Sequence, residues 1–117
     1  MRTCVVLVLD LSRDDSVKVF HEIFEKLKGI RGAFLLAYFI DTGVSNLIPK
    51  VKEALLSNLS VPVRIYLSNN YQDIMKALER DLSECVEVSA YLVTSRNYGE
   101  QILKMLKERG VGEITIC

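Results

Sequence analysis

The stretch Cys4-Val5-Val6-Leu7-Val8-Leu9-Asp10-Leu11-Ser12 decides the fold of this chain. Its first six residues are apolar without a break, whereas a strand with one solvated face would alternate apolar and polar residues. We therefore expect residues 4–9 to form a strand that is buried on both faces, as in the centre of a parallel sheet. Asp10 and Ser12 then lie at the carboxyl end of this strand, where α/β proteins bind their ligands.

The rest of the chain alternates between strand-like apolar runs and segments with helical spacing. We expect further strands at residues 33–40, 63–67, 86–93 and 112–117. The apolar stripes of the intervening helices are Val17, Phe20, Ile23, Phe24 and Leu27, then Leu47, Ile48, Val51, Leu55 and Leu59, then Ile74, Met75, Leu78 and Leu82, and finally Ile102, Leu103 and Leu106. This order predicts one α/β domain over residues 1–117, a three-layer α/β/α fold with a five-stranded, mainly parallel sheet.

Polar residues and glycines mark where the helices are expected to begin and end. Capping side chains accept hydrogen bonds from the first helical amides, and glycine commonly follows the last turn. The second helix is expected to begin at Ser45 or Asn46, with Pro49 in its first turn. The candidate caps for the other helices are Ser12 with Asp15, Asn70 with Asp73, and Asn97 with Glu100, and the candidate stops are Gly29, Gly32 and Gly110.

Two strand orders are common for such a sheet, 3-2-1-4-5 and the flavodoxin-like order 2-1-3-4-5. Residues 33–40 are apolar on both faces, as a central strand would be, whereas residues 63–67 alternate and carry Arg64, as an edge strand can. The pattern favours 3-2-1-4-5, with 2-1-3-4-5 as the alternative. In the favoured order the sheet reverses direction between the first and fourth strands. The residues expected to meet at that crevice are Asp10, Ser12, Thr94, Ser95 and Arg96.

Composition limits the classes of partner. The chain carries 15 basic and 15 acidic residues, so its formal net charge is zero. Proteins that bind nucleic acid usually show a basic excess, and we therefore expect no nucleic-acid partner. The apolar runs are far shorter than a membrane span, and the first of them ends at Asp10 without a cleavage site for a signal peptide. We expect a cytoplasmic protein without a membrane partner.

The sequence offers no recognisable catalytic set or metal site. It contains no phosphate-binding P-loop and no G-x-G-x-x-G after the first strand. Cys4, Cys85 and Cys117 are widely spaced, and His21, the single histidine, lies on a helix between Phe20 and Glu22. Because zinc needs about four ligands at short spacings, we expect no metal. The cysteines are expected to be buried or terminal thiols, with Cys117 the most reactive.

The residues after the first two strands form a candidate ligand site. Asp10 can accept hydrogen bonds from hydroxyl or amino groups, while Ser12 and the first helical amides can face a phosphate. The alternative is that Ser12 only caps the helix and Asp10 only solvates a strand end. Asp41 allows the same two interpretations. Arg96 is the cation expected at the crevice, to bind a phosphate or to pair with Asp10 or Asp14.

In the layout of its strands and helices and in the motifs that end its strands, the chain resembles the universal stress protein family. That family opens with a strand ending in D-G-S, followed by another serine and a long helix; here Asp10-Leu11-Ser12 is followed by Ser16. Its second strand ends near an aspartate, as does Ile40-Asp41 here, and its fourth runs into G-S-R or G-T-R, here Thr94-Ser95-Arg96. The resemblance covers nearly the whole chain. It implies the strand order 3-2-1-4-5 of adenine-nucleotide alpha-hydrolase-like folds and a homodimer formed through the last strand.

The chain departs from this family in the motif that binds the nucleotide. Members that bind ATP carry G-x2-G-x9-G-[ST] after the fourth strand, and only Gly99 falls on that pattern here. Arg96 stands at the first glycine, Arg109-Gly110-Val111 lies near the third, and Leu11 replaces the glycine of D-G-S. Neither ATP nor AMP is therefore the expected cofactor.

Two functional hypotheses follow. The leading one is a non-enzymatic domain, similar to universal stress proteins, that acts through dimerisation or partner binding; an open strand edge such as residues 113–117 recruits further strands. The alternative is a small-molecule or nucleotide site of reduced size at the crevice. Its candidate residues are Asp10, Ser12, Asp41, Thr94, Ser95 and Arg96.

Overall fold

The computed structural model describes residues 2–41 and 48–117. The described residues form five strands and four helices in strict alternation. The elements are β1 (Arg2–Asp10), α1 (Ser16–Leu27), β2 (Phe34–Ile40), α2 (Ile48–Asn58), β3 (Val63–Ser68), α3 (Tyr71–Leu82), β4 (Cys85–Val93), α4 (Arg96–Glu108) and β5 (Glu113–Ile116). No described helix has the length and apolarity needed to cross a membrane.

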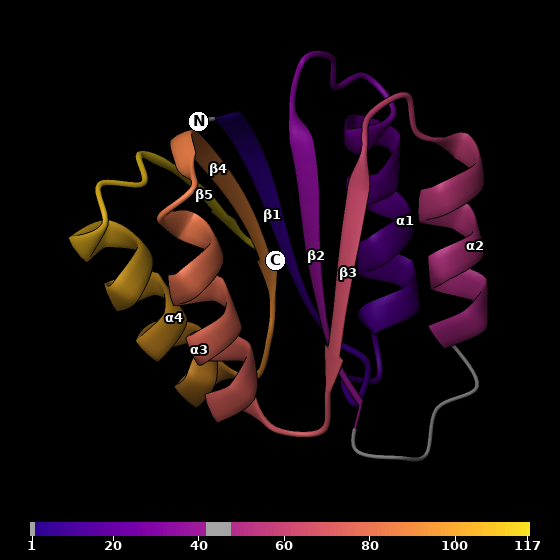
Figure 1. Cartoon of the computed structure of the whole chain (residues 1–117). Helices are drawn as coiled ribbons and strands as arrows, with labels where there is room; N and C mark the ends of the chain where they lie inside the picture. Colours follow the sequence, from indigo (N-terminus) through magenta and orange to yellow (C-terminus); the bar gives the residue numbers. More distant parts are fainter. Residues whose placement is uncertain (1, 42–47) are drawn as a thin grey trace.

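The sheet has the order β3-β2-β1-β4-β5, and every described strand pair is parallel. The predicted order 3-2-1-4-5 is therefore confirmed and the flavodoxin-like order is wrong. Figure 1 shows α1 and α2 on one face of the sheet and α3 and α4 on the other. Because β1 pairs with both β2 and β4, the reversal of direction lies between β1 and β4.

Burial on both faces explains the unbroken apolar run of β1. Its side chains alternate between two core clusters, and every residue from Cys4 to Asp10 is buried. Cys4, Val6 and Val8 pack with residues of α3 and α4. Val5, Leu7 and Leu9 pack with residues of α1 and α2. At the edge of the sheet no residue of β3 is fully buried, and Arg64 and Leu67 are exposed, so the edge position is as predicted although burial does not alternate strictly along the strand.

The helix caps confirm one prediction and correct another. Asn70 caps α3, because its side chain accepts a hydrogen bond of 2.8 Å from the backbone amide of Asp73. The predicted cap at Asn97 is wrong: α4 already begins at Arg96, so Asn97 lies inside the first turn. The residue before the helix is Ser95, whose side chain makes no capping hydrogen bond.

The predicted Ser12 cap of α1 is also wrong. This helix begins at Ser16 after Asp15, whose side chain makes no capping hydrogen bond, and the Ser12 hydroxyl bonds to Asp10. The start of α2 expected at Ser45 or Asn46, and Leu47 on its stripe, lie outside the described residues. Its description begins at Ile48, so Pro49 is its second described residue.

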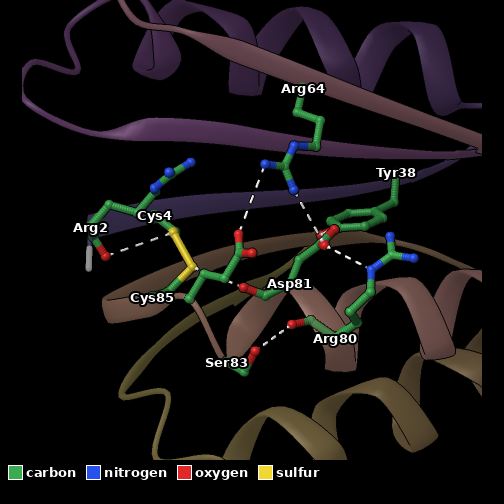
Figure 2. Close-up of a disulfide and its surroundings, with 9 residues drawn as sticks. Arg2, Cys4, Tyr38, Arg64, Arg80, Asp81, Ser83 and Cys85 are labelled. Atoms are coloured by element: carbon green, nitrogen blue, oxygen red, sulfur yellow. Dashed lines mark hydrogen bonds and ion pairs between the residues drawn. A yellow bond between two sulfur atoms is a disulfide. The ribbon is translucent and has the colours of Figure 1, made fainter.

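The cysteine prediction is corrected by a disulfide. Cys4 and Cys85, separated by 81 positions, are bonded with their Cα atoms 5.9 Å apart (Figure 2). Adjacent β1 and β4 bring the two sulfurs together, which spacing along the chain does not reveal. Cys117 is a free and exposed thiol, as predicted.

Candidate functional site

The carboxylate of Asp10 is buried and surrounded by donors at the end of β1. Only 2% of the residue is exposed. Its Oδ1 accepts hydrogen bonds from the Ser12 amide at 2.9 Å and the Ser12 hydroxyl at 2.5 Å, an arrangement that aspartate favours in turns. Its Oδ2 accepts a hydrogen bond from the hydroxyl of Tyr71. The protein itself therefore occupies both carboxylate oxygens.

Tyr71 spans the crevice between β1 and β4. It is the first residue of α3, and its hydroxyl also accepts a hydrogen bond of 3.1 Å from the Ser95 amide. Its ring stacks on Tyr98 with 4.0 Å between centroids. Burial, together with the hydrogen bond to Asp10, raises the pKa of Tyr71 to about 12. The phenol thus joins the end of β1 to the start of α4.

Sequence reasoning missed Tyr71, although two signals were present. The residue directly follows the Asn70 cap, and it precedes Ile74 and Leu78 at the spacing of one buried helix face. A tyrosine on a buried face needs a partner for its hydroxyl. The nearest strand ends in the favoured sheet order would have supplied Asp10 as that partner.

Thr94 lies behind the start of α4 and explains the nearby glycine. It is buried, and a Cβ placed on Gly99 would lie 2.5 Å from its hydroxyl oxygen. Only glycine leaves room at this position without a shift of Thr94. Packing against Thr94 therefore accounts for the one glycine that falls on the nucleotide-binding pattern.

The prediction that Arg96 is the cation at the crevice is wrong. Its side chain is 92% exposed and lies 4.0 Å from Glu100 on the same helix. Arg13 occupies that place: its guanidinium donates to the carbonyl oxygens of Thr94 at 3.1 Å and Cys117 at 2.8 Å. It also pairs with Asp15 at 2.7 Å, and this hydrogen bonding lowers the pKa of the Asp15 carboxyl.

Asp41 lies on the other side of β1 from β4. It follows β2, and its amide donates to the carbonyl of Ser68 at the end of β3, at 3.0 Å. At the crevice, Tyr71 therefore links Asp10, which is bonded to Ser12, to the amide of Ser95. Arg13 bonds to the carbonyl oxygen of Thr94 beside them. Asp41 instead lies between the ends of β2 and β3. The residues that follow it in the chain, 42–47, are outside the described part.

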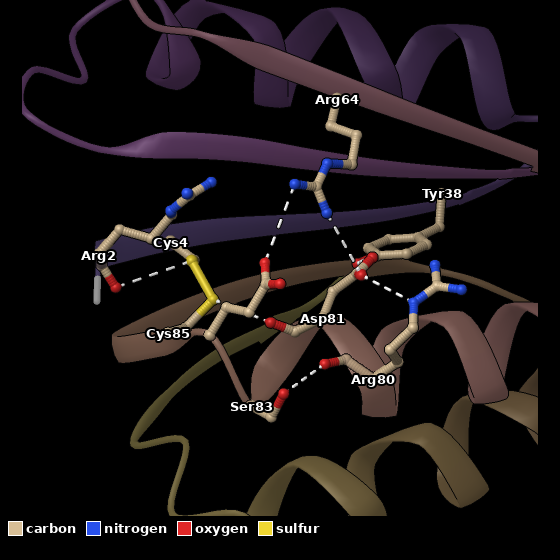
Figure 3. A network of polar contacts seen from close by, with 9 residues as sticks. Arg2, Cys4, Tyr38, Arg64, Arg80, Asp81, Ser83 and Cys85 are labelled. Atoms are coloured by element: carbon tan, nitrogen blue, oxygen red, sulfur yellow. Dashed lines mark hydrogen bonds and ion pairs between the residues drawn. A yellow bond between two sulfur atoms is a disulfide. The ribbon is translucent and has the colours of Figure 1, made fainter.

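A second buried carboxylate lies under the opposite end of the sheet (Figure 3). Asp81 on α3 accepts a hydrogen bond of 2.7 Å from the hydroxyl of Tyr38 on β2. Its other oxygen lies 3.3 Å from Arg64 and 3.2 Å from Arg80. Burial and the bond to Asp81 raise the pKa of Tyr38 far above its ordinary value. These contacts satisfy buried polar groups and hold α3 against β2 and β3.

Comparison of the chain with protein-family models, with curated proteins and with solved structures found no match. The resemblance to the universal stress proteins therefore stays a prediction, based on the residues quoted above. What the structure adds is the strand order β3-β2-β1-β4-β5.

Replacing Tyr71 with phenylalanine tests the bridge across the crevice. We expect the free energy of unfolding to fall by about 1–3 kcal/mol, because Asp10 and Ser95 lose a buried partner. Because the pKa of Tyr71 is raised from 10 to about 12 in the folded protein, the protonated hydroxyl stabilises the fold fully below pH 10. This contribution to the free energy of unfolding is lost as the pH rises through about 12. The wild type should therefore lose more stability than the variant over this alkaline range.

Urea unfolding at a series of pH values measures both effects. Tyr98→Phe is the matched control, because it keeps the stacked ring and leaves the bonds of the Tyr71 hydroxyl in place. Identical alkaline losses in wild type and Tyr71→Phe would show that this hydroxyl does not bridge the two strand ends.

Proposed function

We propose that the chain is a non-catalytic domain, similar to universal stress proteins, that acts by pairing with a second copy of itself along β5. The observation that carries the proposal is the open edge of that strand. Among the described strands, β5 pairs with β4 alone, from Ser89 opposite Glu113 to Leu92 opposite Ile116. An edge of this kind is a template for a further strand.

The direction of the backbone groups at this edge supports pairing. The amide of Cys117 donates inward to the Leu92 carbonyl at 2.9 Å. Because these groups alternate along a parallel strand, the amides and carbonyls of Ile114 and Ile116 point outward. Ile116 as a whole residue is 62% exposed, so apolar surface accompanies the free backbone groups. An antiparallel copy of β5 would cover both.

Proline at position 116 tests this edge. We expect the wild type to sediment as a dimer at tens of micromolar and Ile116→Pro as a monomer, because proline removes an outward amide. The inward amide of Cys117 and its bond to β4 are kept. Ile116→Val, which keeps both the amide and a β-branched side chain, should remain dimeric. A monomeric wild type in analytical ultracentrifugation would end the proposal.

One observation favours the alternative, a small-molecule site. The hydroxyl of Ser16 is buried at the start of α1 and has no hydrogen-bond partner among the described residues. The amides at a helix start attract anions. Against a ligand stands Asp10, whose two oxygens are already bonded to Ser12 and Tyr71.

Thermal-shift titration separates the two functions. We expect ATP, AMP and their magnesium complexes to leave the melting temperature unchanged, because a ligand must displace Tyr71 to reach Asp10. A rise that is lost in both Asp10→Ala and Ser16→Ala would support the small-molecule site instead. Ser12→Ala, which removes only the hydroxyl bond to Asp10, serves as the control for local disturbance.

The proposal places the protein in the cytoplasm, with one condition. Disulfides persist in oxidising compartments and inside hyperthermophiles, and they are rare in other cytoplasms. The Cys4–Cys85 bond is therefore compatible with a cytoplasmic location only in a cell of the hyperthermophile kind, and otherwise favours an oxidising compartment. A count of free thiols on protein from the cytoplasmic fraction, extracted under acid, checks both points: one thiol is expected if the bonded chain is present there.

A further inference from the structure

The disulfide joins two sulfurs with very different surroundings. Cys4 lies on the central strand β1, between Phe34 of β2 and Val88 of β4, and none of its surface is exposed. Cys85 is the first residue of β4 and is only partly buried. Thiol–disulfide exchange requires a thiolate to reach one of the two sulfurs in line. Access therefore differs between the two ends of the bond.

The edge of the sheet is open beside Cys85. Because β5 pairs with β4 only from Ser89 onward, the ladder gives Cys85, Glu87 and Val88 a partner on the β1 side alone. The register between β1 and β4 also shifts here and passes over Val86, which is 64% exposed. A pocket of about 160 Å³ opens at this edge, lined by Cys85, Val86 and Arg109 among others. A small molecule can approach Cys85 by this route.

The surroundings also suit the reduced form. The Cys85 sulfur lies 3.5 Å from the carbonyl oxygen of Asp81, and the Cys4 sulfur 3.8 Å from that of Arg2 (Figure 2). Bonded sulfurs carry no hydrogen, so neither contact is a hydrogen bond in the disulfide. After reduction each thiol has an acceptor in place. Reduction therefore need not leave either thiol without a hydrogen-bond acceptor.

The charged groups near this pocket are largely paired. Arg109 lines the pocket and bonds to Glu79 at 2.5 Å. Glu84, which precedes Cys85, lies 3.9 Å from Arg64. An incoming thiolate therefore meets a guanidinium whose charge is partly neutralised and a carboxylate that is partly screened.

We propose that Cys85 is a thiol-exchange site at which low-molecular-weight thiols open the disulfide in the folded protein. The thiolate attacks the Cys85 sulfur, a new S–S bond forms, and the bond to Cys4 breaks. The electron pair goes to the Cys4 sulfur, which takes up a proton and donates to the Arg2 carbonyl. A second thiolate attacks the sulfur of the first and releases Cys85 as a thiol. Overall, two thiols become one disulfide and the protein disulfide becomes two thiols.

Reduced glutathione tests whether folded protein reacts. The chain carries Cys117→Ser, which removes the free thiol, and the reaction is stopped with acid and followed by mass spectrometry. We expect the rate to rise in proportion to glutathione. Leu55→Ala, in the core on the opposite face of the sheet, should change the rate by less than about twofold.

If the disulfide were reduced only in globally unfolded molecules, the reduction rate would respond in the opposite way to glutathione and to Leu55→Ala. The rate would level off at high glutathione, and Leu55→Ala would raise it about 30-fold or more, because that truncation enlarges the unfolded fraction by such a factor. Either result overturns the proposal. This comparison uses the intact cross-linked chain, so it does not depend on the folding of a cysteine variant.

Single variants test which sulfur is attacked. In the Cys117→Ser background, Cys4→Ser leaves Cys85 as the only thiol, and Cys85→Ser leaves Cys4. With oxidised glutathione, and with both variants shown to be folded by circular dichroism, Cys85 should form a mixed disulfide at least about 10-fold faster. Equal rates, or faster reaction at Cys4, would contradict the assignment.

Discussion

Replacing Cys4 and Cys85 together with alanine is expected to lower the free energy of unfolding by about 4 kcal/mol. The bond closes a loop between residues 81 positions apart. Such a cross-link limits the conformations of the unfolded chain, and the stabilisation grows with the length of the loop. The sulfurs lie against the core cluster of α3 and α4, and alanine fits that space without adding a polar group.

Urea unfolding and thermal melting measure the loss. A change of this size corresponds to a melting temperature about 15 °C lower for a chain of this length. Cys117→Ser is the control and should be almost neutral, because that residue is exposed and unbonded. The expectation fails if the double variant and the control unfold at the same urea concentration.

Asp81→Ala is expected to destabilise the fold by about 3–5 kcal/mol. The carboxylate is buried and is the acceptor for the hydroxyl of Tyr38, which is itself buried. Its removal leaves that hydroxyl without an acceptor and Arg64 without its closest carboxylate. Because α3 contacts β2 and β3 at this point, the helix should loosen from that half of the sheet.

Two further variants separate charge from hydrogen bonding. Asp81→Asn keeps an acceptor for Tyr38 and should lose less stability than alanine. Arg80→Ala should cost less than about 1 kcal/mol, because the Arg80 side chain is 68% exposed and surface pairs contribute little. Equal losses for Asp81→Ala and Arg80→Ala in urea unfolding would show that the buried contacts contribute nothing beyond a surface pair.

The pattern of apolar residues was enough to predict the sheet. A continuous apolar run indicates a strand buried on both faces, and an alternating run indicates a strand buried on one face. On this basis β2 could be placed inside the sheet and β3 at its edge. The position of β1 beside β4 then followed from the order. Asn70 could be predicted as a cap because its hydrogen bond joins residues three positions apart.

Contacts between distant elements could not be predicted in the same way. The Cys4–Cys85 bond, the Tyr71 bridge and the Tyr38–Asp81 pair depend on strand register and side-chain direction, which no local pattern carries. Arg13 was overlooked because its charged segment suggested only a helix start. Arg96 was chosen because it closely follows the predicted fourth strand, yet as the first residue of α4 its side chain is exposed to solvent.

The seam between β1 and β4 is fastened at both of its ends. The disulfide holds the amino ends, and Tyr71 joins Asp10 to Ser95 at the carboxyl ends. This seam divides the sheet into a half built from β1, β2 and β3 and a half built from β4 and β5. Two folded copies of the chain therefore cannot exchange these halves by domain swapping unless the Cys4–Cys85 bond is broken. A monomer with this bond intact can enter a domain-swapped dimer only after the bond has been opened.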